Sequence, residues 1–111
     1  MSLDITFESY KKLYCPHCGE LVDTRPVCNA PDNCRIWYDF LEQIGYYVPH
    51  EELTEENDWY GKDMPLSDEQ IRLAYDFVKA HNYDLYNGEG IRGLLTEAIV
   101  EKYSVSVRAD W

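Results

Sequence analysis

Four cysteines in the first third of this 111-residue chain have the type and spacing of metal ligands. Cys15, Cys18, Cys28 and Cys34 follow the pattern C-x2-C-x9-C-x5-C. In a C-x2-C turn both thiolates point into one hollow, and zinc takes four thiolates in a tetrahedron that leaves no position for water. Gly19, directly after the first pair, lets the chain bend there without a Cβ penalty. We therefore predict one structural zinc ion bound by the four cysteines.

Other states of these cysteines remain open. His17 would be able to replace Cys28 or Cys34 as a ligand, and iron is also bound by four thiolates. The N-terminus has neither the basic region nor the apolar region of a signal peptide, which favours the cytoplasm. In a reducing compartment clustered cysteines more often bind a metal than form disulfides. A disulfide or unligated thiols are the other interpretations of the four cysteines.

The chain carries no pattern typical of an enzyme. Its three histidines, His17, His50 and His81, lie far apart in the sequence, and the one after Pro49 is not followed by a second histidine in an H-E-x-x-H motif. The Gly88-Glu89-Gly90 stretch resembles a dinucleotide-binding loop only superficially, because it precedes a helix without following a strand. We expect no catalytic activity.

The charge of the chain excludes several functions. Acidic residues number 21 and basic residues 10, giving a net charge of −11. Nucleic-acid-binding domains usually carry a basic patch, because neutralising phosphates supplies most of their affinity. An acidic protein is instead attracted to a protein surface built to bind nucleic acid. We therefore expect a protein partner and no direct nucleic-acid contact, and no apolar run is long enough for a membrane span.

One segment carries most of this charge. Residues 51–70 contain eight acidic residues and one lysine, a net charge of −7. The acids surround an adjacent Trp-Tyr pair, and aromatic residues of this kind anchor protein interfaces. The alternative is a solvated loop with Trp59 packed into the core. The predicted partner-binding residues are Glu51, Glu52, Glu55, Glu56, Asp58, Trp59, Tyr60 and Asp63.

Hydrophobic periodicity predicts the elements that position these residues. Alternation over residues 3–8 indicates a half-buried strand, and residues 11–34 are typical of a zinc-knuckle loop. A helix is expected over residues 34–44, with Asp32 or Asn33 as its N-cap and Cys34 in its first turn. Residues 45–66 then form a long acidic connecting loop.

The second half of the chain predicts two further helices and a strand. Ser67 with Gln70 is a capping-box pattern that begins one helix, and the spacing of apolar residues from Ile91 to Ile99 indicates another after a turn over residues 82–90. Residues 104–110 alternate as a closing strand, which would pair with residues 3–8. The expected fold is a single α+β domain, residues 1–111, with about three helices, a short antiparallel sheet pairing the N- and C-terminal strands, and an N-terminal zinc knuckle.

The whole chain resembles the zinc-containing anti-CRISPR proteins that phages and mobile elements encode against type II Cas9. The residues that carry the resemblance are Cys15-Pro16-His17-Cys18-Gly19, Cys28, Cys34, Gly45-Tyr46-Tyr47-Val48-Pro49 and Trp59-Tyr60-Gly61. The resemblance implies a stoichiometric inhibitor in the bacterial host cytoplasm that blocks target-DNA binding. Cas9 binds its nucleic acid in a positively charged channel, to which an acidic protein would be drawn.

Two other functions fit the same sequence. The first is a zinc-ribbon accessory protein in phage transcription or replication, for which Lys11, Lys12 and Arg25 would supply contacts to nucleic acid. Such binding would fall steeply with salt concentration. The second is a small fold with a housekeeping role in the phage or its host.

Overall fold

Strand β1 (Asp4–Tyr14) lies in the middle of the sheet in this computed structural model, which describes residues 3–111. It pairs antiparallel with β2 (Leu21–Asp32) on one side and with β4 (Ser104–Asp110) on the other. A two-residue strand, β3 (Met64–Pro65), completes the order β2-β1-β4-β3. The predicted pairing of the two terminal segments is confirmed, with register running from Asp4 opposite Asp110 to Tyr10 opposite Ser104.

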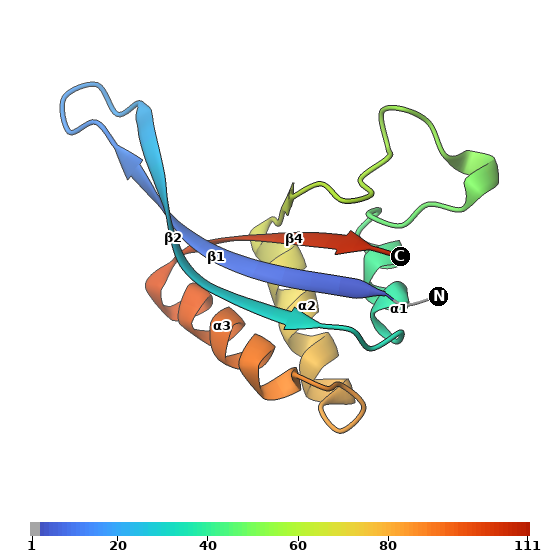
Figure 1. Ribbon diagram of the computed structural model, residues 1–111. Coiled ribbons are helices and arrows are strands. Elements are labelled where there is room, and N and C mark those ends of the chain that lie inside the picture. The colour runs from blue at the N-terminus through green and yellow to red at the C-terminus, as the bar shows by residue number, and fades with distance from the viewer. Residues whose placement is uncertain (1–2) are drawn as a thin grey trace.

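Three α-helices accompany the sheet, as the sequence predicts. They are α1 (Trp37–Gln43), α2 (Asp68–His81) and α3 (Gly88–Glu101), and a single 3-10 turn, η1 (His50–Glu52), lies within the predicted connecting loop. Helices α2 and α3 lie side by side across one face of the sheet, and α1 lies at the end where the C-terminus also lies (Figure 1). The protein is a small α+β fold.

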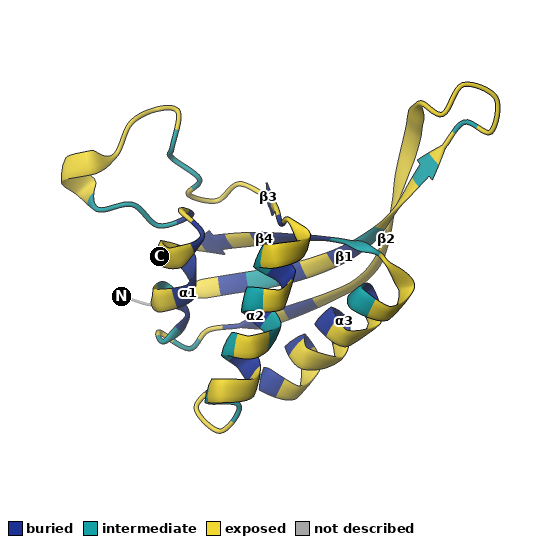
Figure 2. Cartoon of the chain, turned by 180° about the vertical axis from the view of Figure 1, so that it is seen from behind, coloured by how far each residue is buried: buried dark blue, intermediate teal, exposed yellow. Residues whose placement is uncertain are grey.

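The hydrophobic core lies between the sheet and these helices. In the first half of β1 every second residue is buried and its neighbours are exposed or half-buried, which is the period of two expected for a half-buried sheet (Figure 2). Strand β4 buries Val105, Val107 and Ala109 in the same way, and Ser106, which pairs with β3, is buried as well. Helices α2 and α3 contribute stripes at helical spacing. The innermost side chains are Leu3, Ile5, Phe7, Trp37, Phe40, Leu41, Tyr46, Val78, Ile91, Leu95, Val105 and Val107.

The predicted helix ends are partly confirmed. Ser67 Oγ accepts the Gln70 backbone N–H at 3.2 Å and the Gln70 side chain accepts the Ser67 N–H at 2.9 Å, so the capping box is present. Gly45 follows α1 with a φ of +79°, a left-handed conformation that favours glycine. Helix α3 begins at Gly88, within the stretch predicted as a turn, with Asn87 as its N-cap.

The prediction of a loop over residues 11–34 is wrong, because most of this segment is strand. Strands β1 and β2 form a long hairpin, and only residues 15–20 lie between them. The prolines and the few aliphatic residues of the segment suggested a loop. However, β2 is an edge strand, where Pro26 and Pro31 need not donate a ladder hydrogen bond. A register shift beside Pro26 adds an unpaired residue, a bulge of the kind common at sheet edges.

The predicted N-cap of the first helix is also wrong. Ile36 is the N-cap of α1, so Cys34 precedes the helix. Asp32 instead binds four donors: its Oδ1 accepts the N–H groups of Asn33 (2.6 Å) and Cys34 (3.1 Å), and its Oδ2 accepts Trp37 Nε1 (3.1 Å) and the Asn87 N–H (3.4 Å). This buried carboxylate therefore joins the end of β2 to α1 and to the start of α3.

We expect Asp32→Ala to lower the free energy of unfolding by about 2–4 kcal/mol, because it leaves the buried Trp37 N–H and neighbouring donors without an acceptor. Urea denaturation measures the change. The control is Asp76→Ala on the exposed face of α2, which should change stability by less than about 0.5 kcal/mol. Equal effects of the two substitutions would contradict the role of Asp32.

Candidate functional site

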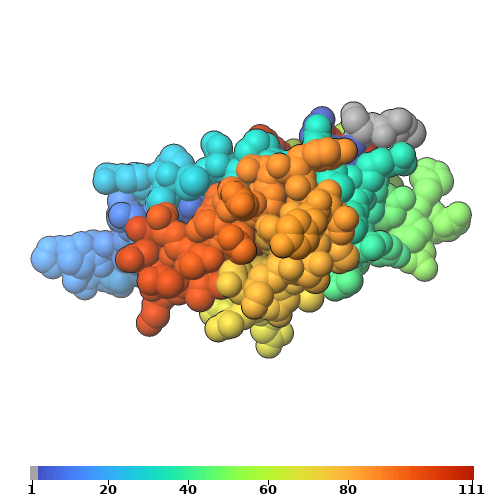
Figure 3. All heavy atoms as spheres, turned by 90° about the horizontal axis from the view of Figure 1, so that it is seen from below, coloured from blue at the N-terminus to red at the C-terminus, as the bar shows by residue number. Residues whose placement is uncertain are grey.

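Part of the acidic segment projects from the body of the molecule. Seven of the eight acidic residues between positions 51 and 70 are exposed, and Asp58 is half-buried. The loop over residues 51–58 lies at the opposite end of the molecule from the tip of the β1–β2 hairpin, with α2 and α3 between them (Figures 1 and 3). The rest of the segment contains β3 and the start of α2. Its negative charge is therefore displayed on a surface that a partner can reach.

Within residues 3–111 none of these carboxylates forms an ion pair. The one ion pair there is His81 Nδ1 to Asp84 Oδ2, at 3.6 Å, in the turn after α2. The carboxylates of residues 51–58 are therefore free to pair with an external cation. Such a concentration of like charge is favoured when a cationic surface docks against it.

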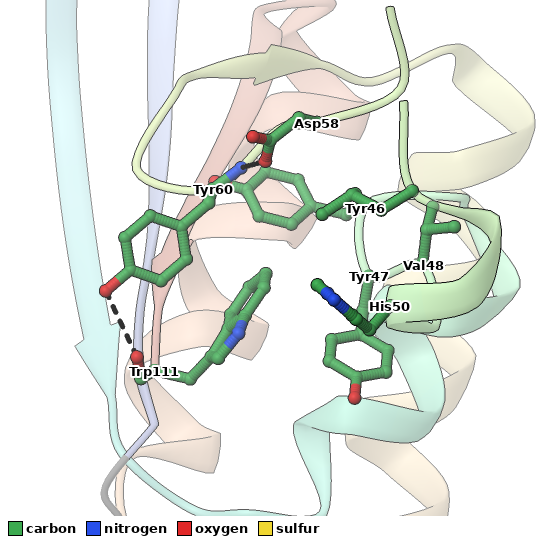
Figure 4. A pocket seen from close by; sticks show the side chains of 8 residues that line it. Tyr46, Tyr47, Val48, His50, Asp58, Tyr60 and Trp111 are labelled. Atoms are coloured by element: carbon green, nitrogen blue, oxygen red, sulfur yellow. Dashed lines mark hydrogen bonds between the residues drawn. The ribbon is translucent and has the colours of Figure 1, made fainter. Parts of the chain in front are cut away.

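The acidic segment borders a hollow of about 280 Å³ whose walls are mainly aromatic (Figure 4). Its walls come from the start of the connecting loop, from η1 and the residues after it, and from the C-terminal residue. The rings of Tyr47, Tyr60 and Trp111 face the same space, and the His50 ring points toward it. The lining residues are Tyr46, Tyr47, Val48, His50, Leu53, Asp58, Tyr60 and Trp111.

Trp111 is the centre of this aromatic cluster. Its ring meets Tyr60 edge-on at 4.8 Å and 90° between ring planes, and meets Tyr47 at 5.2 Å and 66°. Tyr46 lies at 6.2 Å from it. Edge-to-face pairs at these separations stabilise one another beyond the area that they bury. The rings are therefore positioned before any ligand arrives.

Hydrogen bonds attach the acidic segment to β4 and the C-terminus. The Tyr46 hydroxyl accepts the Ala109 N–H at 2.8 Å, and donates to the Lys62 carbonyl at 2.7 Å. The Tyr60 hydroxyl donates to the Trp111 carbonyl at 3.1 Å (Figure 4). Burial raises the pKa of Tyr46, although its hydrogen bonds to Ala109 and Lys62 act in the opposite direction.

The structure divides the predicted partner-binding residues between two environments. Asp58 and Tyr60 line the hollow, and Glu51, Glu52, Glu55 and Glu56 are exposed on the loop that borders it. Trp59 is half-buried against the core, 6.5 Å from the Tyr46 ring, and neither it nor Asp63 lines the hollow.

Sequence reasoning missed the other aromatic residues of the site. Tyr46, Tyr47 and His50 precede the acidic stretch, and Trp111 lies about forty residues beyond it. The Gly-Tyr-Tyr-Val-Pro-His run was the available signal, because paired tyrosines next to a proline suit an exposed aromatic surface. Nothing in the sequence pairs that run with Trp111.

The chemistry of this hollow suits a single cationic side chain. Aromatic faces attract a cation within about 6 Å of the ring centroid, and a neighbouring carboxylate adds a charge-assisted hydrogen bond. Asp58 lies at the edge of the hollow, where its carboxylate accepts the Tyr60 N–H at 3.2 Å. A volume of about 280 Å³ is just below the range of pockets for whole small molecules, about 300–1,000 Å³.

The first cysteine pair lies at the exposed tip of the hairpin. The Cys15 N–H donates to the Glu20 carbonyl at 2.8 Å and the Gly19 N–H donates to the Cys15 carbonyl at 2.9 Å, which closes the turn. The pKa of the Cys15 thiol is lowered by hydrogen bonds from the backbone N–H groups of Cys18 and His17 and from the Cys18 side chain. Gly19 has a φ of +75°.

The other two cysteines lie elsewhere. Cys28 is on β2 opposite Ser9, six residues along β1 from Cys15, a separation of about 20 Å at strand spacing. The Cys34 thiol donates to the Asp84 carbonyl at 3.2 Å, beyond the far end of β2. Two thiolates on one zinc lie within about 5 Å of each other, since each Zn–S bond is about 2.3 Å.

The four cysteines therefore do not fit one metal ion in this conformation. Within residues 3–111, no group of three or more His, Cys, Asp or Glu side chains is arranged to bind a metal. The zinc knuckle over residues 11–34 is replaced by the hairpin, and the four-cysteine site stays a prediction.

A second hollow has the opposite charge. A groove of about 800 Å³ runs between the hairpin and the ends of α2 and α3, and Lys12, Arg72 and Lys102 line it with a single acid, Asp68. Beside it, the Lys11 ammonium lies 5.3 Å from the centroid of the Tyr103 ring. This groove is the basic surface of an otherwise acidic molecule.

Comparisons with known proteins do not extend these observations. No protein-family model, curated protein or solved structure matches the chain. In the part of the chain that the structure describes, no helix is both long and apolar enough to cross a membrane.

We expect Tyr46→Phe to lower the free energy of unfolding by about 1–2 kcal/mol near neutral pH, because the buried Ala109 N–H loses its acceptor. Tyrosine in the unfolded chain ionises near pH 10, and burial raises the pKa of Tyr46 in the folded protein. Its contribution is fully present below about pH 10 and is lost as the pH rises through the folded-state pKa.

Urea denaturation of the wild type and of Tyr46→Phe, near pH 7 and near pH 11, tests the direction of this pH dependence. The stability difference between wild type and Tyr46→Phe should shrink at the higher pH, while the other tyrosines titrate equally in both. A difference that is unchanged or larger at alkaline pH would contradict the account.

Proposed function

We propose that this protein is a non-catalytic binding protein that docks its acidic segment and aromatic hollow onto a basic surface of a nucleic-acid-handling protein and blocks that surface. The observation that carries the proposal is the unpaired acidic segment beside a preformed aromatic hollow. The charge attracts a basic surface at long range, and the hollow takes one lysine or arginine side chain at its centre.

The two parts of the site have different roles in this proposal. Exposed carboxylates raise the association rate and make binding depend on salt concentration, but each contributes little affinity. The hollow supplies a desolvated contact, in which a cation over Trp111 and Tyr60 is worth up to about 2 kcal/mol. Arginine is favoured over lysine, because its planar guanidinium stacks on aromatic faces and also pairs with a carboxylate such as Asp58.

The partner that we propose to test first is guide-loaded type II Cas9, inside the bacterial cytoplasm. The resemblance described above points to it, and its nucleic-acid channel is lined by lysine and arginine. A protein with exposed carboxylates at one end would occupy contacts that the target DNA needs. The expected outcome is one inhibitor chain per effector complex, with loss of target-DNA binding.

The basic groove supports a second candidate function, an accessory protein that contacts nucleic acid directly. Lys12, Arg72 and Lys102 lie together there, and Arg25 lies on the same hairpin opposite Lys11. Binding through these residues would weaken steeply as salt concentration rises. Direct binding of the free protein to DNA or RNA, abolished by Lys12→Glu with Arg72→Glu, would favour this candidate over the first.

The acidic segment is tested by neutralising Glu51, Glu52, Glu55 and Glu56 to glutamine in one variant. We expect at least about tenfold weaker binding to guide-loaded Cas9 by biolayer interferometry, because four charge contacts of a few tenths of a kcal/mol each sum to about 1.4 kcal/mol or more. The salt dependence of the association rate should also fall.

The matched control neutralises four exposed acids on the helices, Asp76, Glu89, Glu97 and Glu101, and so changes net charge by the same amount. It should weaken binding by less than about threefold, which is under about 0.7 kcal/mol. Equal losses in the two variants would show that net charge alone matters and would contradict the proposed docking surface. Absence of any binding by the wild-type protein would remove Cas9 as the partner.

The aromatic hollow is tested by Trp111→Leu, compared with Trp111→Phe. The leucine variant removes the ring face and should bind the partner about three- to tenfold more weakly, whereas phenylalanine should retain most of the affinity. Tyr83→Leu, at a fully exposed ring in the turn after α2, is the control and should bind like wild type. Melting temperatures confirm folding, and equal binding by the leucine and phenylalanine variants would contradict a cation in the hollow.

A further inference from the structure

The tip of the β1–β2 hairpin carries a thiol pair that nothing else in the molecule uses. Cys15 is half-buried and Cys18 is exposed, and both are free thiols. The Cys15 N–H donates to the Glu20 carbonyl at 2.8 Å and the Gly19 N–H donates to the Cys15 carbonyl at 2.9 Å, so a closed turn holds both cysteines at the end of the arm. Gly19 takes the left-handed conformation in this turn, which favours glycine.

This pair supplies only half of a zinc site. Zinc in a structural site takes four ligands, and two thiolates leave two positions empty. Cys28 lies about 20 Å away along the hairpin. Cys34 is beyond the far end of β2 and donates to Asp84. Within residues 3–111, no third His, Cys, Asp or Glu side chain joins the pair in a group arranged to bind a metal. The missing ligands would then come from outside the chain.

The surface around the pair is unusually apolar for an exposed arm. Three large hydrophobic side chains near the tip are exposed: Tyr14 (56%), Leu21 (51%) and Val22 (64%). The distal half of the hairpin extends past the helices and has no core to pack against (Figure 2). Exposed apolar patches of this kind mark interaction sites.

The charge near the tip allows a second copy of the chain to bind there without strong repulsion. Residues 10–28 carry three basic and two acidic residues, whereas the rest of the chain is strongly acidic. Two copies meeting tip to tip keep the acidic loops over residues 51–58 at the two distant ends, because that loop lies opposite the tip in each copy (Figure 3). Any closer packing of two chains of net charge −11 would add strong repulsion.

We propose that Cys15 and Cys18 of two copies of this chain bind one zinc ion between their hairpin tips and so form a twofold dimer. Four thiols lose four protons to solvent as four Zn–S bonds form, which gives a closed four-thiolate shell. The same pair from each copy satisfies the symmetry of a twofold contact. The apolar residues around the tip, Val22 among them, pack across the contact.

The test is a titration of the purified full-length chain, kept reduced, with zinc alone. Light scattering coupled to gel filtration measures mass, and elemental analysis of the same fractions measures zinc. We expect twice the chain mass of 13.1 kDa at half a zinc ion per chain, and a return to the monomer after chelation. Cys15→Ser and Cys18→Ser should stay monomeric and bind no zinc.

Cys28→Ser and Cys34→Ser are the matched controls and should dimerise like wild type. Val22→Asp should weaken the dimer at least about tenfold while leaving both thiols in place, which distinguishes a packed contact from bare metal bridging. A monomer with one zinc ion per chain, lost in all four cysteine variants, would overturn the proposal in favour of a single-chain site. A zinc-independent monomer, or a dimer that only oxidation forms, would also overturn it.

Discussion

The double pairing of β1 is the constraint on which the rest of the structure depends. Over residues 4–10 the strand bonds to β4 on one side and to β2 on the other, and helices α2 and α3 cover its buried face. Beyond Tyr10 only β2 continues beside it, so the same strand becomes one side of an exposed arm. Burial of alternate residues stabilises the first half, whereas the second half has hydrogen bonds but little core.

This constraint explains which parts of the fold could be predicted from the sequence. The helices beginning at Ser67 and near Ile91 have strong local signals, and the alternation of residues 104–110 against 3–8 is sufficient to pair the terminal strands. Strand β2 has no such signal, because residues 21–29 are exposed on both faces and Pro26 and Pro31 usually indicate loops. Only its pairing with β1 makes it a strand, and that contact is tertiary.

The sequence predicts the charge of the candidate site and two of the residues that line the hollow, Asp58 and Tyr60. The sequence shows eight acidic residues among the twenty of the acidic segment. The hollow beside them is lined both by residues between positions 46 and 60 and by Trp111, which directly follows β4. Tyr46 makes that connection, since its buried hydroxyl bonds the Ala109 N–H. The cysteine spacing is typical of one zinc site, whereas the long hairpin separates the first pair from Cys28 in this conformation. The arm and the acidic end are therefore two distant surfaces with different chemistry.

Hydrogen–deuterium exchange of the protein, alone and bound to guide-loaded Cas9, tests the central claim that the acidic end is the docking surface. The account predicts that binding slows exchange in peptides covering residues 46–60 and in the C-terminal peptide containing Trp111, while residues 11–28 exchange as in the free protein. Protection of the hairpin and of the helix ends at the basic groove, with residues 46–60 unchanged, would contradict it.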